Sequence, residues 1–145
     1  MQECKSLGLE EARVIIEAGV EAAKKTGDPG ITIAVVDRHG DAVCLMRMEG
    51  IAGSTVHMAL AKAYTAIGTL TDTIEFRERM SAEPYELHPV PNFTVIPGGV
   101  LIKTKDGTIV GAVGTSGRRA TGPGSDEEIA RAVAAAFEKT RGFEG

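Results

Sequence analysis

The sequence predicts an α+β domain in which an antiparallel sheet of about five strands is flanked by helices. Strand-like segments follow one another in pairs joined by tight turns, and segments with helical spacing lie near both ends of the chain and in its middle. Strands joined by short turns pair in antiparallel fashion, and the helices can then cover the sheet. Neither a linker nor an internal repeat divides the 145 residues, so we expect a single domain over residues 1–145.

The first third of the chain predicts a helix followed by a hairpin. Apolar residues recur at helical spacing from Leu9 to Lys25, with glutamates in the first turn, lysines in the last turn and Gly27 just beyond the end. The segments Ile31–Asp37 and Ala42–Met48 are strand-like, and the short segment "RHGD" between them is typical of a turn. We therefore expect two adjacent antiparallel strands here.

Two further helices are expected in the middle of the chain. Ser54 can cap a helix that continues on an apolar stripe to about Leu70. Asp72 and Glu75 have the spacing of a capping box, which predicts a short helix to about Met80. The proline-rich segment that follows, "SAEPYELHPVPN", predicts an extended loop.

Three more strands are expected after this loop: Phe93–Ile96, Val100–Lys105 and Thr108–Thr115. Asp106-Gly107 suits the tight turn between the last two, because both central residues of that turn need positive φ. Pro97, Gly98 and Gly99 separate the first two strands. These residue types weaken strands, so they predict a bend.

The last element expected is a helix from Asp126 to about Lys139. Ser125 and Glu128 have the spacing of a capping box at its start. A glycine-rich loop, "SGRRATGPGS", joins this helix to the preceding strand. Helices at both ends and in the middle of the chain can cover the sheet, which gives the domain a profilin-like or PAS-like outline.

The composition argues against several classes of partner. The formal net charge is −4 and the basic residues are scattered, so neither nucleic acid nor an anionic membrane is expected as a partner. No apolar run is long enough to span a bilayer and no secretory leader is present, so we expect a cytoplasmic location. Cys4 and Cys44 lack the spacing of a metal or redox site.

A series of short motifs runs along nearly the whole chain: "LEEARVIIEAGVEAAKK", "ITIAVVDRHGDAV", "RMEG", "ALAKAYTA", "PGGV", "GTIVGAVGTSG" and "DEEIARA". In this order they resemble the GlcG-like proteins, also called the heme-binding HbpS-like family, which includes the C-terminal domain of PduO-type proteins. The resemblance implies a profilin-like antiparallel sheet and assembly into homo-oligomers. It also implies heme or a related tetrapyrrole as the ligand of some members, while others accompany catabolic enzymes.

The glycine-rich segments predict one wall of a ligand pocket. Gly98 and Gly99 precede one expected strand, and Ser116 and Gly117 end the next, so the four residues can meet at one end of the sheet. Backbone N–H groups at a glycine bend can face an anion, and a purely structural strand crossing is an equal alternative. A pocket there would suit a carboxylate, such as a heme propionate or a small organic acid.

Charged residues could complete that pocket. Arg47 ends an apolar strand, where its guanidinium either points to solvent or binds a carboxylate. Lys62 lies in an alanine-rich part of a helix, either as a functional group or as a surface lysine that covers apolar neighbours. Glu49 is a plausible partner for either charge, and Arg118 lies in the loop beyond Gly117.

Two of the three histidines are candidates for axial ligation of a heme iron. His57 lies early in the second helix and is a candidate axial ligand or general base, while His88 lies in the proline-rich loop. The alternative for both is an ordinary exposed or hydrogen-bonded histidine. His39 belongs to a turn, where solvation is expected. The spacing of the histidines does not indicate a dedicated zinc or iron site.

Three functions are therefore open. The first is binding of a small carboxylate-bearing ligand, with heme as the cofactor that the resemblance implies. The second is an enzyme of the isomerase or hydrolase type that acts on a carboxylate, enol or imine of a catabolic pathway. Lys62 or His57 would then move a proton while Arg47 holds the carboxylate. The third is a non-catalytic accessory subunit whose homo-oligomer surface is the function.

Overall fold

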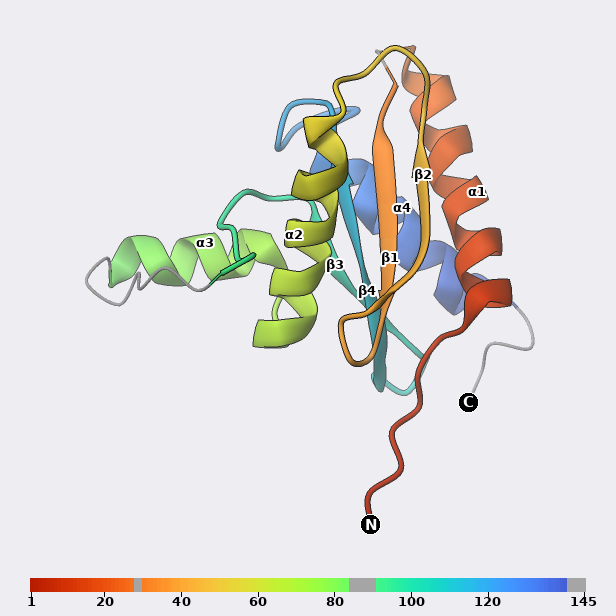
Figure 1. Cartoon of the computed structure of the whole chain (residues 1–145), viewed down its shortest axis with the longest axis vertical. Helices are drawn as coiled ribbons and strands as arrows, with labels where there is room; N and C mark the ends of the chain where they lie inside the picture. The colour runs from red at the N-terminus through yellow and green to blue at the C-terminus, as the bar shows by residue number, and fades with distance from the viewer. Residues whose placement is uncertain (28–29, 84–90, 141–145) are drawn as a thin grey trace.

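The described residues form a four-stranded antiparallel sheet with helices on both faces (Figure 1). This computed structural model describes residues 1–27, 30–83 and 91–140. The elements are α1 (Leu9–Thr26), β1 (Thr32–Asp37), β2 (Ala42–Arg47), α2 (Ser54–Thr69), α3 (Thr73–Ala82), β3 (Gly99–Lys103), β4 (Ile109–Ser116) and α4 (Asp126–Lys139). The strand order is β2-β1-β4-β3, and each neighbouring pair is antiparallel. The predicted α+β class is confirmed.

Among the described residues the sheet has four strands where about five were expected, because Phe93–Ile96 is not a strand. The backbone N–H of Thr94 donates to Thr65 Oγ1 of α2 at 2.9 Å instead of to a neighbouring strand. The Phe93 ring packs on Tyr64, with 5.4 Å between the ring centroids. This segment therefore packs on α2 as irregular chain, and β3 begins only at Gly99. Most of the loop expected before it lies outside the described residues.

Two of the expected helix caps differ in the structure. α2 begins at Ser54 itself, so this serine is not the N-cap. Asp72 is the N-cap of α3, but its side chain makes no capping bond and Oδ1 accepts the N–H of Leu101 in β3 at 2.9 Å. Thr73 Oγ1 likewise accepts the N–H of Gly99 at 2.9 Å. The start of α3 thus binds the outer edge of β3, which protects that edge from pairing with another strand.

The cap of α4 agrees with the sequence prediction. Ser125 Oγ accepts the N–H of Glu128 at 3.2 Å, and the Glu128 carboxylate accepts the N–H of Gly124 at 2.7 Å.

We expect Ser125→Ala to lower the free energy of unfolding by about 1 kcal/mol, because one N–H of the first turn loses its partner. Urea denaturation measures the change. Ser54→Ala is the matched control, since Ser54 makes no such bond, and equal losses in the two variants would contradict the capping role.

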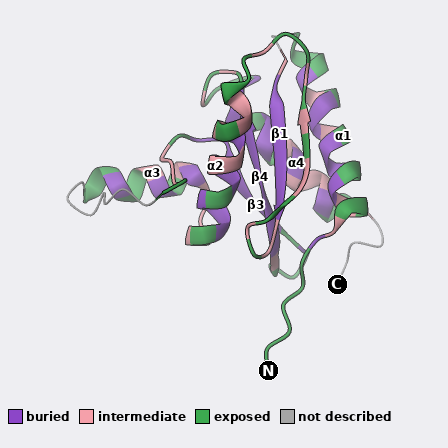
Figure 2. Ribbon diagram, in the orientation of Figure 1, coloured by how far each residue is buried: buried purple, intermediate pink, exposed green. Residues whose placement is uncertain are grey.

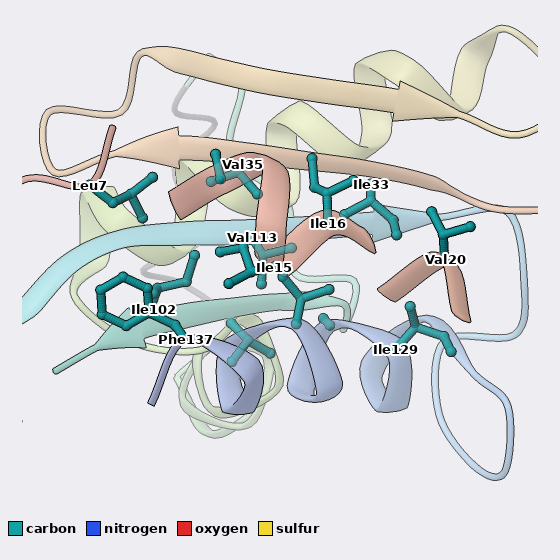
Figure 3. Packing of buried hydrophobic residues seen from close by; sticks show 14 of the residues in the cluster. Leu7, Ile15, Ile16, Val20, Ile33, Val35, Ile102, Val113, Ile129 and Phe137 are labelled. Carbon is teal, nitrogen blue, oxygen red and sulfur yellow. The ribbon is translucent and has the colours of Figure 1, made fainter. Parts of the chain in front are cut away.

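The larger part of the core lies between the sheet and the helices α1 and α4 (Figure 3). Ile33 and Val35 of β1 point to this side, where they meet the apolar faces of α1 and α4. Alternate residues of the same strand, Thr32 and Ala34, face α2 on the other side and are also fully buried. Both faces of β1 and β4 are therefore covered, as Figure 2 shows by their colour.

β2 is the exception, because it is an edge strand that α2 does not cover. α2 packs on β1, β4 and β3, and the residues of β2 are exposed or half-buried (Figure 2). Leu45 pairs with Ala34, so it lies on the α2 side of the sheet, where 37% of it is exposed. The α2 side of β2 is therefore partly exposed at Leu45. No helix among the described residues is long and apolar enough to span a membrane.

Candidate functional site

The structure brings the two glycine-rich segments together at one end of the sheet. Gly98 O accepts the N–H of Thr115 at 2.9 Å, so the bend before β3 adjoins the end of β4. Gly98, Gly99 and Ser116 are buried, whereas Gly117 is exposed. The glycines allow a close approach of α2. A Cβ on Gly98, which has a φ of +124°, would lie 3.0 Å from Lys62 Nζ, and one on Gly99 would lie 2.3 Å from Lys62 O.

The backbone N–H groups at this bend bind groups of the protein itself. The N–H of Gly98 donates to Glu127 Oε1 at 3.1 Å, and the N–H of Gly99 donates to Thr73 Oγ1. Both N–H groups are therefore occupied. A carboxylate does lie at the bend, but it belongs to the first turn of α4.

Lys62 is the most deeply buried charged residue of the predicted set, with 1% of the residue exposed. Its ammonium donates to Thr115 O at 2.8 Å and to Asp126 Oδ2 at 3.1 Å. Burial lowers the pKa of Lys62, and the charge of Asp126 partly offsets this. Burial also raises the pKa of Asp126, and the charge and hydrogen bond of Lys62 partly offset this rise. The amine thus joins α2 to β4 and to the start of α4.

A second buried carboxylate extends this ion pair. Glu127 accepts a hydrogen bond from Arg131 Nε at 2.6 Å, and burial raises the pKa of Glu127. We refer to Lys62, Asp126, Glu127 and Arg131 as the ionic cluster. Two positive and two negative charges balance within it. In the described residues, each of its buried polar side-chain atoms has a hydrogen-bond partner.

The guanidinium of Arg118 binds the end of α1. It donates to Ala23 O at 2.9 Å and to Gly124 O at 3.1 Å, and it also contacts the hydroxyl of Thr26. The backbone N–H of Arg118 donates to Asp126 Oδ1 at 3.0 Å. An arginine bound to the last carbonyls of a helix complements the dipole of that helix. Arg118 therefore joins α1 to the loop before α4.

Arg47 and Glu49 lie on the surface at the end of β2. The guanidinium of Arg47 lies beside Gly53, the residue before α2. A Cβ added to Gly53 would be 3.4 Å from Arg47 Nη1. The first turn of α2 contains no acidic residue, so the positive end of its dipole and Arg47 lie together. This end of α2 is suited to an anion by charge, in contrast to the occupied N–H groups at Gly98 and Gly99.

A groove between α2 and the β1–β2 hairpin contains one predicted site residue, His57. We call it the α2–β2 groove; its volume is about 340 Å³, and its lining residues are Val36, Gly40, Asp41, Ala42, His57, Leu60, Ala61, Tyr64 and Asn92. The open α2 side of β2 continues this lining through Leu45 to Arg47, because these residues pair with Ala34 and Thr32 of β1. Lys62 does not line the groove.

The polar groups of the groove are available to a ligand. Within the described part of the chain, the side chains of Asp41, His57, Tyr64 and Asn92 have no hydrogen-bond or ion-pair partner. His39 is exposed in the β1–β2 turn, and His88 lies outside the described residues. In those residues, no three His, Cys, Asp or Glu side chains are arranged to hold a metal ion. His57 is thus the described histidine that faces the groove.

Sequence reasoning missed several of these residues. The spacing of His57 and Tyr64, seven residues apart in one helix, could have placed both on one face. Asp41 and Asn92 carried no such signal, because they lie in a turn and in irregular chain that only the fold brings to α2. Asp126 and Glu127 read as an ordinary acidic first turn, and nothing local indicated that Lys62 would pair with Asp126.

Comparisons with known proteins agree with the motif series. The family described as "Haem degrading protein HbpS-like" matches residues 7–135. Protein GlcG of Escherichia coli strain K12 is 35% identical over 110 residues, which are 76% of this chain and 81% of GlcG. Two crystal structures of HbpS, one of a Streptomyces reticuli double mutant, are 32% identical with TM-scores of 0.81 and 0.79. Each match covers 93% of this chain, and the matched part is 92% of the first HbpS chain and 89% of the double mutant.

A more distant structure shares the fold. The crystal structure of the PduOC:heme complex is 24% identical, with a TM-score of 0.76, over 90% of this chain and 94% of that one. The family match covers most of the chain, and GlcG is a relative over most of its own length. The chain therefore belongs to the HbpS-like family, as the resemblance of its motifs indicated.

Proposed function

We propose that this protein binds heme, or a closely related carboxylate-bearing tetrapyrrole, in the α2–β2 groove. The observation that carries the proposal is the exposed imidazole of His57, which lines the groove among apolar side chains and has no hydrogen-bond or ion-pair partner in the described residues. The guanidinium of Arg47 lies beyond this lining on the same side of β2. The relatives support it, because HbpS-like proteins are described as heme-degrading and PduOC was crystallised as a heme complex.

The apolar part of the groove lining fits a flat ligand. Leu60 and Ala61 of α2 form one wall, Ala42 lies opposite on β2, and Leu45 extends this apolar lining toward Arg47. Ligand sites of this kind combine mostly apolar walls with a few polar groups that fix the orientation. The macrocycle would lie along α2 and cover the open side of β2, which no helix among the described residues covers.

His57 would be the axial ligand of the heme iron. Heme iron accepts an imidazole nitrogen, and an imidazole without another partner can turn to present either nitrogen. His57 lies four residues after Gly53, so it is roughly 6 Å along the helix axis from the end at which Arg47 lies. This spacing would put the iron near His57 and one edge of the macrocycle near Arg47.

Arg47 would bind a propionate at that edge. A guanidinium binds a carboxylate through paired hydrogen bonds, and the N-terminal end of α2 adds a favourable dipole. The ligand would not contact four of the predicted residues, because they are buried where the opposite face of α2 packs on the sheet: Gly98, Gly99, Ser116 and Lys62. Arg118 would also lie outside the contact, because its guanidinium binds Ala23 O and Gly124 O. Glu49 and Gly117 would lie outside it as well, since they follow the ends of β2 and β4.

Titration with hemin tests the proposal. We expect a saturable shift of the Soret band, and we expect His57→Ala to remove most of that shift and to weaken binding by at least about tenfold, or about 1.4 kcal/mol. His39→Ala is the matched control, because His39 is exposed in a turn and does not line the groove. A spectrum identical to that of free hemin would refute heme binding. If His88→Ala removed the shift and His57→Ala did not, His57 would not be the ligand.

A further inference from the structure

The α2–β2 groove is polar at the end away from Arg47. Gly40 lies against the second half of α2, since a Cβ on it would be 3.4 Å from Tyr64 Cδ1. Asp41 follows Gly40 directly and lines the groove beside Tyr64. Tyr64 lies eleven residues after Gly53 (64 − 53 = 11), which is roughly 16 Å along the helix axis. A cation, Arg47, therefore lies beyond one end of the groove, while a carboxylate and a phenol line the other end.

Asn92 adds an amide to the same end. It precedes Phe93, whose ring packs on Tyr64 at 5.4 Å and on Phe76 at 6.2 Å. These ring contacts hold one side of the Tyr64 ring, while 39% of the residue is exposed and Tyr64 lines the groove. Asp41, Tyr64 and Asn92 together offer an acceptor, a hydroxyl and an amide, none with a partner among the described residues.

A closed heme does not match this polar end. Its two propionates leave from one edge of the macrocycle, and methyl and vinyl groups occupy the opposite edge. With the propionates at Arg47, the hydrocarbon edge would cover Asp41, Tyr64 and Asn92. These groups would lose water without gaining hydrogen bonds, which costs free energy for each group.

An opened tetrapyrrole matches both ends. When the macrocycle is cleaved opposite the propionates, the two outer rings become lactams, each with an N–H donor and a C=O acceptor. Asp41 can accept from a lactam N–H, and the hydroxyl of Tyr64 and the amide of Asn92 can donate to a lactam C=O. The propionates remain on the inner rings, where Arg47 can bind them.

We propose that the α2–β2 groove also binds a linear tetrapyrrole without iron, with its propionates at Arg47 and its lactam edge at Asp41, Tyr64 and Asn92. This inference rests on the proposed function, because it uses the same groove and the same end for the carboxylates. It adds a ligand class that a site serving heme alone would not need to recognise.

Parallel titrations with biliverdin and hemin test it. We expect a saturable change of the biliverdin absorption spectrum. Asp41→Asn and Tyr64→Phe should each weaken biliverdin binding by about tenfold, the size expected for a hydrogen bond to a charged or buried polar group, and should weaken hemin binding less. Tyr64→Phe keeps the ring on Phe93, and Glu78→Gln, exposed on α3, is the control. Arg47→Gln should weaken both ligands, since both carry propionates.

The outcomes separate the two proposals. Binding of hemin without binding of biliverdin would overturn the linear-tetrapyrrole inference and leave heme binding intact. Binding of both ligands, with equal effects of Asp41→Asn and Tyr64→Phe on each, would overturn the lactam contacts. Binding of neither ligand by protein with an unchanged melting temperature would overturn both proposals.

Discussion

Lys62→Met is expected to lower the free energy of unfolding by about 3–5 kcal/mol. The methionine has a similar length and fills the same space, so the loss reflects the charge that remains. Asp126 would stay buried in the first turn of α4 with one carboxylate oxygen unpaired, and Thr115 O would lose its donor. Urea denaturation at neutral pH measures the change. Lys103→Met, an exposed lysine at the end of β3, is the matched control and should change the value by less than about 0.5 kcal/mol.

A double variant distinguishes an unpaired charge from lost packing. Lys62→Met combined with Asp126→Asn removes both charges, while the amide oxygen can still accept the N–H of Arg118. Burial already disfavours both charged forms, because it lowers the pKa of Lys62 and raises that of Asp126. We therefore expect the double variant to be more stable than Lys62→Met alone. Losses that simply add would show that the ion pair contributes little.

The ionic cluster lies apart from the lining of the α2–β2 groove. Lys62 faces the sheet, whereas His57 and Tyr64 lie on the groove side of the same helix. The sequence predicts that Lys62 is either a functional group or a surface lysine. In the structure its amine is buried and bound to the carboxylate of Asp126. The small neighbours Ala59, Ala63 and Ala66 are explained by the sheet, because they let α2 approach β4 closely.

Local signals predicted the elements well and their long-range contacts poorly. The boundaries of α4 and the β1–β2 hairpin follow from capping residues, turn residues and periodicity, all within a few positions of each other. Phe93–Ile96 looked like a strand because its residues favour strands. However, the side chains of Asp72 and Thr73 accept the N–H groups at the outer edge of β3, so this edge does not pair with another strand. The N–H of Thr94 donates to the hydroxyl of Thr65 instead. Such competition between distant partners leaves no local pattern.

The site was harder to predict than the fold for the same reason. The glycine-rich segments predicted either an anion site or a purely structural crossing of strands. In the structure the N–H of Gly98 donates to the carboxylate of Glu127, which lies 29 positions further along the chain. The α2–β2 groove exists because β2 is an edge strand beyond the reach of α2, which depends on the strand order β2-β1-β4-β3. Strand order is a property of the whole sheet, so residues such as Asp41 and Asn92 gave no sign of a shared groove.

Gly114→Ala is expected to lower the stability by an amount comparable to the loss of Lys62. Gly114 lies in β4 directly under α2, and a Cβ on it would lie 1.8 Å from Ala59 O and 2.7 Å from Ala63 N. Both obstructing atoms belong to the helix backbone, so no side chain can rotate out of the way. The helix would have to move from the sheet, and the core between them would lose packing. We expect a loss of more than about 3 kcal/mol in the free energy of unfolding.

Gly8→Ala is the matched control for this substitution. Gly8 precedes α1, and a Cβ on it would make an ordinary contact of 3.7 Å with the Glu11 side chain. We expect its effect to stay below about 1 kcal/mol in the same denaturation experiment. Because the outer face of α2 forms the groove, any Gly114→Ala protein that folds should also bind hemin more weakly, since His57 and Leu60 would move relative to β2. A Gly114→Ala protein with normal stability would mean that α2 lies farther from β4 than the structure places it.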